Sequence, residues 1–326
     1  MKEKIRISVI YKPSYNFFQP NHFDRTTYDF FFTALQRNSL IDVTYFSAEN
    51  SFDVSKLKGN TDIILLPNNY SSAVPENLEG IRNSSIPVFA RTGDAHSAKK
   101  LGQIDFDEKW KIDCYFGKDP SSYFYKYYPK HFRYEVIIFG LESSLYKNLK
   151  PFDQRIKNKI LNSGNVGKTS IISRTANAIL NPKRSAWYFY KLRTKCNYLS
   201  YVEHTKIKGN KYPTLDYPQY LSQYRASIAA TTFYPTQKFW EVPAAGCLTF
   251  MEITEKNDAT FLGFIDNETA VFINEKNYKK KFEEFLYSPD DPKWSQIANN
   301  GRDYVLNNLT NDIAVEKLFN LFKEYI

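Results

Sequence analysis

Short apolar runs alternate with segments of helical spacing along the whole chain, and this alternation restricts the possible folds more than any other feature. Runs such as IRISVIY (5–11) and DIILLP (62–67) are almost continuously apolar. Such strands, when helices lie between them, are typical of parallel sheets, because helices then cover both faces of the sheet. The sequence therefore predicts an α/β fold of Rossmann-like units.

The predicted elements form two successive series, which a polar segment at 142–150 followed by Pro151 separates. In the first series we expect strands at 5–11, 41–46, 62–67, 86–91, 112–117 and 134–140, with helices at 28–37 and 75–82. In the second we expect strands at 157–164, 197–202, 227–231, 247–253 and 270–273, with helices at 171–180, 217–224, 237–245, 278–287, 293–307 and 313–325. We therefore expect two domains, at 1–150 and 151–310.

Composition excludes several other classes of protein. Aromatic residues make up 17% of the 326 residues, so the chain can build a packed core and is not disordered as a whole. Cys114, Cys196 and Cys247 are odd in number and lack metal-ligand spacing, which argues against a disulfide framework or a structural zinc site. The N-terminus resembles a buried strand and not a signal peptide, and no apolar run approaches the roughly 18 residues of a membrane span. We expect a cytoplasmic protein.

A surplus of basic residues points to anionic partners. The chain has 44 Lys+Arg against 35 Asp+Glu, a net charge of +9. Nucleic acids, anionic membrane surfaces and phosphorylated small molecules all fit such a surplus. The densest basic cluster, at 183–195, also contains Trp187 and three further aromatic residues. Single-strand nucleic-acid grooves share this composition. However, an amphipathic helix explains one short stretch better.

The loop after the strand at 157–161 is the first candidate site. Its sequence, 162–170, is rich in small residues, runs into a helix and contains Lys168. Backbone amides, a helix N-terminus and a lysine can together bind a phosphate. A Walker P-loop using Gly167-Lys168-Thr169 would need glycine at position 162, which is Asn162. An NTPase or kinase therefore stays an alternative, as does a plain glycine turn with a surface lysine.

The second candidate site is the helix that begins near Lys238. Helical spacing places Lys238 and Glu241 on neighbouring positions near its N-terminus, after a strand. A carboxylate there can accept hydrogen bonds from both ribose hydroxyls, and the lysine can offer charge to a phosphate. An ordinary surface ion pair is the alternative. We favour the binding site, because Pro243 and the buried strand that follows predict close helix packing.

These residues carry a resemblance to a known family. The stretch 238–246, the strand CLTFMEI, the link at 262–264 and the helix with Asn-Gly301-Arg302 resemble the C-terminal half of GT-B-fold glycosyltransferases. The chain is most similar to the group-1, spore-maturation CgeB-like branch. The resemblance extends over roughly 157–320, whereas 1–150 match only as an α/β half.

The resemblance implies a fold, an activity and a donor site. It implies two Rossmann-like domains facing a cleft, with a C-terminal helix (311–326) that crosses back to the first, acceptor-side domain. The activity would be metal-independent, retaining transfer of a sugar from a nucleoside-diphosphate sugar to a glycan or lipid-linked hydroxyl, without a cofactor (EC 2.4). Glu241 would hold the ribose and Lys238 would lie by the diphosphate. The other implied donor-binding residues are Gly164, Asn165, Lys168 and Arg174.

The resemblance also implies catalytic residues in the first half. Asp94 and His96 follow the strand at 86–91 and would meet the donor sugar or the acceptor hydroxyl. Equally, Asp94 could cap the following helix and His96 could be a surface residue. Many retaining relatives carry a second glutamate eight positions before the ribose-binding one, where this chain has Phe233. The stereochemistry therefore stays open, because inverting fucosyltransferases share the Lys-x-x-Glu helix.

The expected partners follow from charge and resemblance together. They are a nucleotide sugar and a glycan or lipid-linked acceptor, with no specific nucleic acid. The basic surplus also suits peripheral contact with an anionic membrane surface. A non-catalytic carbohydrate-binding protein is the alternative from outside the enzymes.

Overall fold

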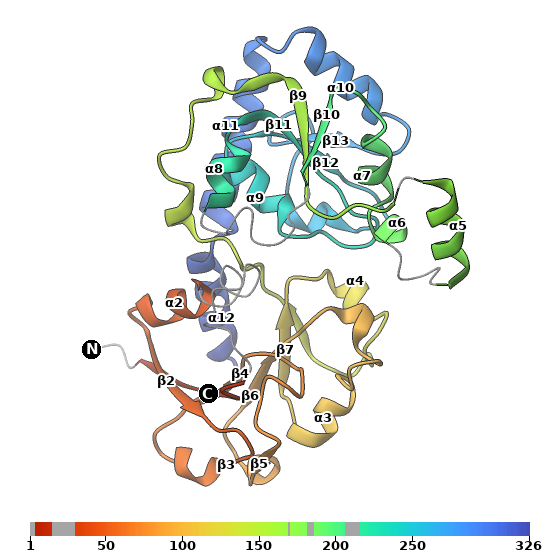
Figure 1. The fold of residues 1–326 in the computed structure, drawn as a ribbon. Helices are drawn as coiled ribbons and strands as arrows, with labels where there is room; N and C mark the ends of the chain where they lie inside the picture. Colours follow the sequence, from red (N-terminus) through yellow and green to blue (C-terminus); the bar gives the residue numbers. More distant parts are fainter. Residues whose placement is uncertain (1–3, 15–29, 169, 181–185, 206–215) are drawn as a thin grey trace. The chain divides into compact units, whose positions relative to one another are not determined.

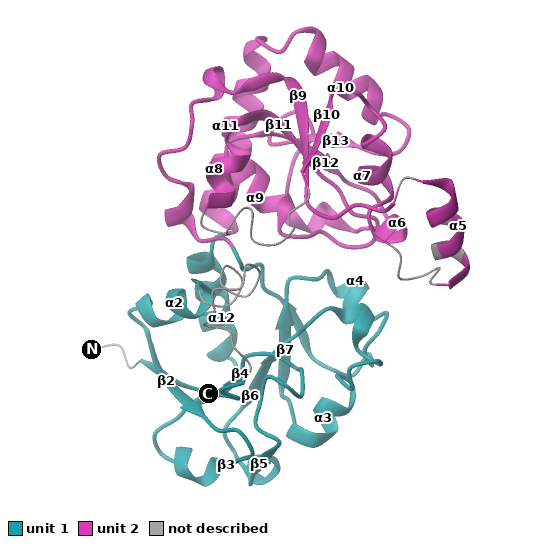
Figure 2. Ribbon diagram, in the orientation of Figure 1, with its two compact units in different colours: residues 1–140, 310–326 teal, residues 141–309 magenta. Residues whose placement is uncertain are grey.

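The chain forms two compact units, each built around a parallel sheet. The computed structural model describes residues 4–14, 30–168, 170–180, 186–205 and 216–326. Unit 1 comprises residues 1–140 and 310–326, and unit 2 comprises residues 141–309 (Figure 2). Every pairing inside the two large sheets is parallel. The predicted α/β fold class is therefore confirmed.

Unit 1 contains a six-stranded sheet in the order β2-β1-β4-β6-β7-β8 (Figure 1). Its strands are β1 (Ile5–Tyr11), β2 (Ile41–Ser47), β4 (Ile63–Leu66), β6 (Val88–Arg91), β7 (Cys114–Gly117) and β8 (Tyr134–Val136), and a separate pair is formed by β3 (Ser51–Asp53) and β5 (Asn77–Glu79). Strand β1 pairs with β2 on one side and with β4 on the other, so the chain reverses its direction across the sheet here. Ligands of open α/β sheets bind at such reversal points, beyond the carboxyl ends of the strands.

The last helix of the chain packs into unit 1. The helices of this unit are α2 (Phe30–Arg37), α3 (Asp105–Trp110), α4 (Ser121–Phe124) and α12 (Asn311–Phe322). The Asn311 side chain accepts a hydrogen bond of 2.7 Å from the Gly140 amide. The ring of Phe322 lies 4.8 Å from that of Phe89 on β6, edge to face. Through these contacts α12 packs against the core of unit 1, which includes Phe89 of β6.

Two sequence predictions of local structure are wrong. The helix predicted at 75–82 is instead strand β5 followed by a short 3-10 turn, Ile81–Asn83. Gly80, with a φ of 78°, separates these two elements, and pairing with β3 holds β5 extended. The strand predicted at 197–202 is largely a turn, and strand β10 begins only at Val202. The apolar residues Leu199 and Tyr201, which suggested a strand, lie in that turn and pack against the core of unit 2.

Unit 2 contains a five-stranded sheet in the order β10-β9-β11-β12-β13. Its strands are β9 (Ile156–Ser163), β10 (Val202–Thr205), β11 (Tyr224–Ala229), β12 (Leu248–Glu252) and β13 (Val271–Ile273), and its helices are α5 (Ile171–Leu180), α6 (Ala186–Phe189), α7 (Lys191–Cys196), α8 (Tyr217–Leu221), α9 (Lys238–Ala244), α10 (Tyr278–Tyr287) and α11 (Pro292–Asn308). Strand β9 lies between β10 and β11, so unit 2 also has a reversal point. Among the described residues, no helix has both the length and the apolarity to cross a bilayer.

Helix α11 packs closely on α9 because it carries Gly301. A Cβ at this position would lie 2.3 Å from the Thr269 carbonyl oxygen. Next to it, Arg302 donates hydrogen bonds to the carbonyls of Ala244 and Tyr146, at 3.3 and 3.0 Å. The Asn-Gly-Arg sequence thus has a packing role beside the end of α9.

We expect Gly301→Ala to lower the unfolding free energy of unit 2 by about 2 kcal/mol, because forced overpacking typically costs 1–3 kcal/mol. The clash with the Thr269 carbonyl outweighs the roughly 1 kcal/mol that alanine gains in a helix interior. Chemical denaturation measures the effect. Asn299→Ala, at an exposed position of α11, is the matched control and should be neutral or slightly stabilising. An unchanged midpoint for Gly301→Ala would contradict the packing role.

Candidate functional site

The carboxyl end of β9 carries the main cluster of polar groups in unit 2. The chain turns there at Gly164, whose φ of 87° favours glycine. Lys238, at the start of α9, donates hydrogen bonds to Ser163 Oγ (2.9 Å) and to the Tyr217 hydroxyl (2.6 Å). Those two hydroxyls are also 2.7 Å apart, within hydrogen-bond distance of each other. Residues from β9, α8 and α9 therefore converge at this strand end.

A second cation, Arg193, reaches the same turn from α7. Its guanidinium donates to the Asn162 side chain (3.0 Å) and to the Ser163 carbonyl, and its side chain is almost fully buried. A Cβ on Gly164 would lie 3.1 Å from Lys238 Cε and 3.5 Å from Arg193 Nη2. The two cations thus lie together on the side of Gly164 where a Cβ would stand, and a larger side chain there would displace one of them.

The positive charge of these two residues is not balanced locally. Within the described residues, neither Lys238 nor Arg193 forms an ion pair with a carboxylate, and all their contacts are with neutral groups. Burial and the neighbouring Arg193 charge lower the pKa of Lys238 to about 7, although Glu241 opposes this shift. Two cations held this close together and largely shielded from water are costly, and an anion bound beside them would lower the cost.

Glu241 lies one helical turn after Lys238 and is 9% exposed. Burial raises the pKa of the Tyr217 and Tyr146 hydroxyls, and the charge of Glu241 raises both further. The carboxylate is therefore close to two tyrosine hydroxyls of the same unit. At the other end of α9, Arg155 donates to the Gly246 carbonyl (2.7 Å), so cationic groups complement the helix C-terminus.

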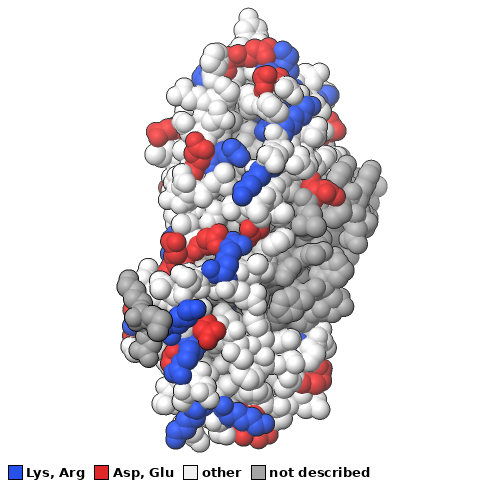
Figure 3. Space-filling model, turned by 90° about the vertical axis from the view of Figure 1, so that its left-hand side faces the viewer, with Lys and Arg blue, Asp and Glu red and all other residues white. Residues whose placement is uncertain are grey.

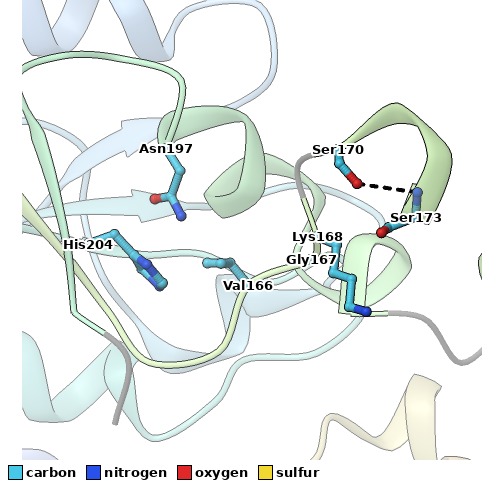
Figure 4. A pocket seen from close by; sticks show the side chains of 7 residues that line it. All are labelled: Val166, Gly167, Lys168, Ser170, Ser173, Asn197 and His204. Atoms are coloured by element: carbon cyan, nitrogen blue, oxygen red, sulfur yellow. Dashed lines mark hydrogen bonds between the residues drawn. The ribbon is translucent and has the colours of Figure 1, made fainter. Parts of the chain in front are cut away.

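The remaining predicted donor residues lie on the loop and helix that follow Gly164. Lys168 is exposed and lines a pocket of about 480 Å³ together with Val166, Gly167, Ser170, Ser173, Asn197 and His204 (Figure 4). Asn165 is exposed, and Arg174 is on α5 with its side chain outside the described part of the structure. Lys168 thus belongs to this pocket, whereas Gly164, Lys238 and Glu241 belong to the cluster at β9.

The predicted phosphate loop differs from a P-loop in the use of its amides. The Gly167 amide donates to Thr194 Oγ1 at 2.8 Å, and a Cβ at Gly167 would lie 2.6 Å from the backbone of Trp187. This glycine therefore packs against α6 and α7, and its amide is already bonded inside the protein. Thr169, the third residue of the alternative P-loop, lies outside the described residues.

In unit 1, Asp94 and His96 lie beyond the carboxyl end of β6. Asp94 precedes the short 3-10 turn Ala95–Ser97 and His96 is its middle residue; among the described groups the Asp94 side chain makes no capping hydrogen bond to the turn. The Asp119 carboxylate, beyond β7, instead accepts the Ala95 amide. Asp119 is 6% exposed, and burial raises its pKa to about 7. The capping role considered for Asp94 therefore falls to Asp119.

The sequence did not identify several polar residues that are buried in the structure. Arg193 was one basic residue of an amphipathic stretch, and nothing in that pattern distinguishes it from its neighbours. Glu252 ends β12 at 6% exposure, and its Oε2 has no hydrogen-bond partner among the described residues. Burial raises the pKa of Glu252 to about 8, and the charge of Glu275 adds to the shift. A carboxylate at the end of an apolar strand was the available signal for Glu252.

Comparison with known proteins finds a family that matches part of the chain. A family described as "Glycosyl transferase-like" matches residues 183–320. The findings support a glycosyltransferase of the GT-B fold. No curated protein matches the chain in sequence. The match covers α9 and most of the cluster at β9, and the CgeB-like branch stays a prediction.

Solved structures share the fold over nearly the whole chain. A sucrose-phosphate synthase from Thermosynechococcus elongatus is 12% identical with a TM-score of 0.58, covering 98% of this chain and 99% of that one. An alpha-glucosyltransferase in complex with UDP-glucose and DNA has 11% identity and a TM-score of 0.56, with coverage of 98% and 100%. Anabaena HepE, solved with UDP and glucose, has 10% identity and a TM-score of 0.55, with the same coverage. At these identities, the likeness shows the fold.

Proposed function

We propose that the protein transfers a sugar from a nucleoside-diphosphate sugar to a hydroxyl of a glycan or lipid-linked acceptor, without a metal ion and with retention of configuration. The observation that carries this proposal is the pair of cations beside Gly164, the buried Arg193 and the half-buried Lys238. Neither forms a direct ion pair with a carboxylate within the described residues, although the charge of Glu241 acts on Lys238 from one helical turn away. A diphosphate would add negative charge beside both cations.

The reaction needs the departing diphosphate to be stabilised as its charge develops. Lys238 is already oriented by Ser163 and Tyr217, so it would need no reorganisation when the bond to the sugar breaks. Glu241, one turn further along α9, would accept the ribose hydroxyls and fix the nucleoside. We propose that these cations take the role that a metal ion has in other transferases.

We assign the residues at the end of β6 to the transferred sugar or the acceptor. Asp94 or His96 would hold the reacting hydroxyl, and Asp119 would fix the turn that carries them, because it accepts the Ala95 amide. Asp119 is thus a positioning residue. The GT-B neighbours solved with UDP favour a UDP-sugar donor. Peripheral contact with an anionic membrane would suit a lipid-linked acceptor.

A thermal-shift screen with UDP, GDP, ADP and CMP sugars tests the donor site. A ligand at 100 times its Kd stabilises the folded form by about 2.7 kcal/mol, so a matching nucleotide should raise Tm clearly. Glu241→Gln should reduce this rise, because an amide accepts fewer hydrogen bonds from ribose than a carboxylate. Glu255→Gln, an exposed glutamate of unit 2, is the control and should leave the rise unchanged. The assignment of the donor site is wrong if no nucleotide raises Tm. It is also wrong if the rise for Glu241→Gln is as large as that for the wild type.

A further inference from the structure

Helix α5 exposes its apolar side chains to solvent. Ile171, Ile172, Ile179 and Leu180 are 78%, 84%, 74% and 75% exposed. Apolar side chains of helices in soluble units normally face the core, as Trp294 and Ile297 do on α11. Figure 1 shows α5 at the outer edge of unit 2, beyond α6 and away from the sheet. Its apolar residues therefore contribute nothing visible to the core of this unit.

The exposed apolar residues form one continuous face. At about 100° per residue, Ile171, Ile179, Ile172 and Leu180 follow one another around half of the helix circumference. Thr175 and Ala176, also exposed, lie within the same half. Ser173 is half-buried and borders this face, about 20° beyond Leu180. The helix is about 15 Å long, which suits a helix lying in the plane of a membrane interface.

The stretch of sequence that contains this helix carries charge of one sign. Residues 164–184 contain Lys168, Arg174, Lys183 and Arg184 and no acidic residue. Lys168 is exposed and has no carboxylate partner in the described part of the chain. By contrast, on the face drawn in Figure 3, acidic side chains lie among the basic ones. An apolar helix face in a stretch of sequence whose charged residues are all basic is the composition of interfacial helices that bind anionic lipids.

We propose that α5 docks unit 2 to an anionic phospholipid surface, with Ile171, Ile172, Ile179 and Leu180 inserted at the boundary of headgroups and acyl chains. This inference rests on the proposed function and locates its membrane contact on α5. A second copy of the chain is a poorer occupant, because each copy has a net charge of +9 and would bring the same cations to the interface. An anionic lipid surface complements both the apolar face and its charge.

Sedimentation with lipid vesicles tests the proposal on the full-length protein. We expect binding to vesicles containing phosphatidylglycerol, at least tenfold weaker binding to pure phosphatidylcholine, and weakening at high salt. The double variant Ile172→Ser/Ile179→Ser should bind anionic vesicles at least tenfold more weakly than the wild type, because two aliphatic side chains no longer insert. Ile265→Ser, at a 52% exposed position of unit 2 outside α5, is the matched control and should bind as the wild type does.

The outcomes separate this inference from the donor site. Nucleotide-induced thermal shifts, measured on the same variants, should be retained, and they also report that each variant is folded. The inference is overturned if the wild type does not bind anionic vesicles, or if the double variant binds as Ile265→Ser does. It is also overturned if the wild type is a dimer that the double variant dissociates, since α5 would then join two copies. Loss of the nucleotide shift in wild type and variants alike would reject the donor site while leaving vesicle binding informative.

Discussion

Replacing Lys238 by methionine should weaken nucleoside-diphosphate binding by about a hundredfold while making the unliganded protein more stable. The loss of affinity follows from removing a desolvated charge that would face the diphosphate, since such contacts are worth 2–5 kcal/mol. The gain in stability follows because the folded protein holds this amine buried beside Arg193. Ser163 and Tyr217 remain within hydrogen-bond distance of each other, so neither hydroxyl is left without a partner.

The pH dependence of this stability gain has a defined sign. Because folding lowers the pKa of Lys238 to about 7, the unfolded chain binds more protons than the folded protein above that pH. Wild-type stability from this group is therefore lowest at pH 7 and below, and recovers as the pH rises. The gain of Lys238→Met should shrink by about 1.4 kcal/mol per pH unit between pH 7 and 9.

Isothermal titration with UDP and denaturation at several pH values measure both effects. Lys276→Met, an exposed lysine before α10, is the matched control and should change neither affinity nor stability appreciably. A Lys238→Met protein that binds UDP normally would reject the donor site. One that is destabilised at pH 7 would show that its hydrogen bonds outweigh the cost of the buried charge.

Replacing Glu252 by glutamine should stabilise the protein at pH 8 by roughly 3 kcal/mol, which raises Tm by several degrees. Burial raises the pKa of this carboxyl to about 8, so the folded protein binds more protons than the unfolded chain between about pH 4.5 and 8. Stability from Glu252 is therefore full at low pH and is lost as the pH rises through that window. Glutamine keeps the shape, stays neutral and can still accept the Thr231 amide.

The difference in Tm between Glu252→Gln and wild type should be small at pH 5 and large at pH 8. Glu268→Gln, an exposed glutamate on a loop of the same unit, serves as the control and should show no such trend. If Glu252→Gln is less stable than wild type at pH 8, the ionised carboxylate makes interactions that the described contacts do not include. If it also loses donor binding, Glu252 contacts the ligand in addition to being buried.

The sequence predicted the secondary structure well where the hydrophobic periodicity is strong. It failed where pairing with a distant strand determines the conformation. Strand β1 and helix α10 have the predicted bounds, because continuous apolar runs and helical spacing are local properties. Strand β5 was predicted as a helix, because its extended form depends on β3, which lies more than twenty residues earlier. A one-dimensional pattern does not contain that partner.

The candidate site divides in the same way. Lys238 and Glu241 could be predicted as a pair, since they are three positions apart on one helix. Their convergence with Gly164 and Arg193 could not, because it depends on which strand ends are neighbours in the sheet. Lys168 looked equally suitable in the sequence, but it lines a pocket that borders the cluster, where His204 Nε2 lies 2.9 Å from the Gly164 carbonyl oxygen.

The sequence by itself determined the α/β class, the two successive series of elements and the Lys-x-x-Glu helix, because each follows from residue types at short spacing. Only the tertiary structure decided that Lys238 lies beside the buried Arg193, that Glu252 is enclosed, and that the apolar face of α5 is not. The physical reason is that burial and charge compensation depend on neighbours distant in the chain, and these set the energy of every ionisable group.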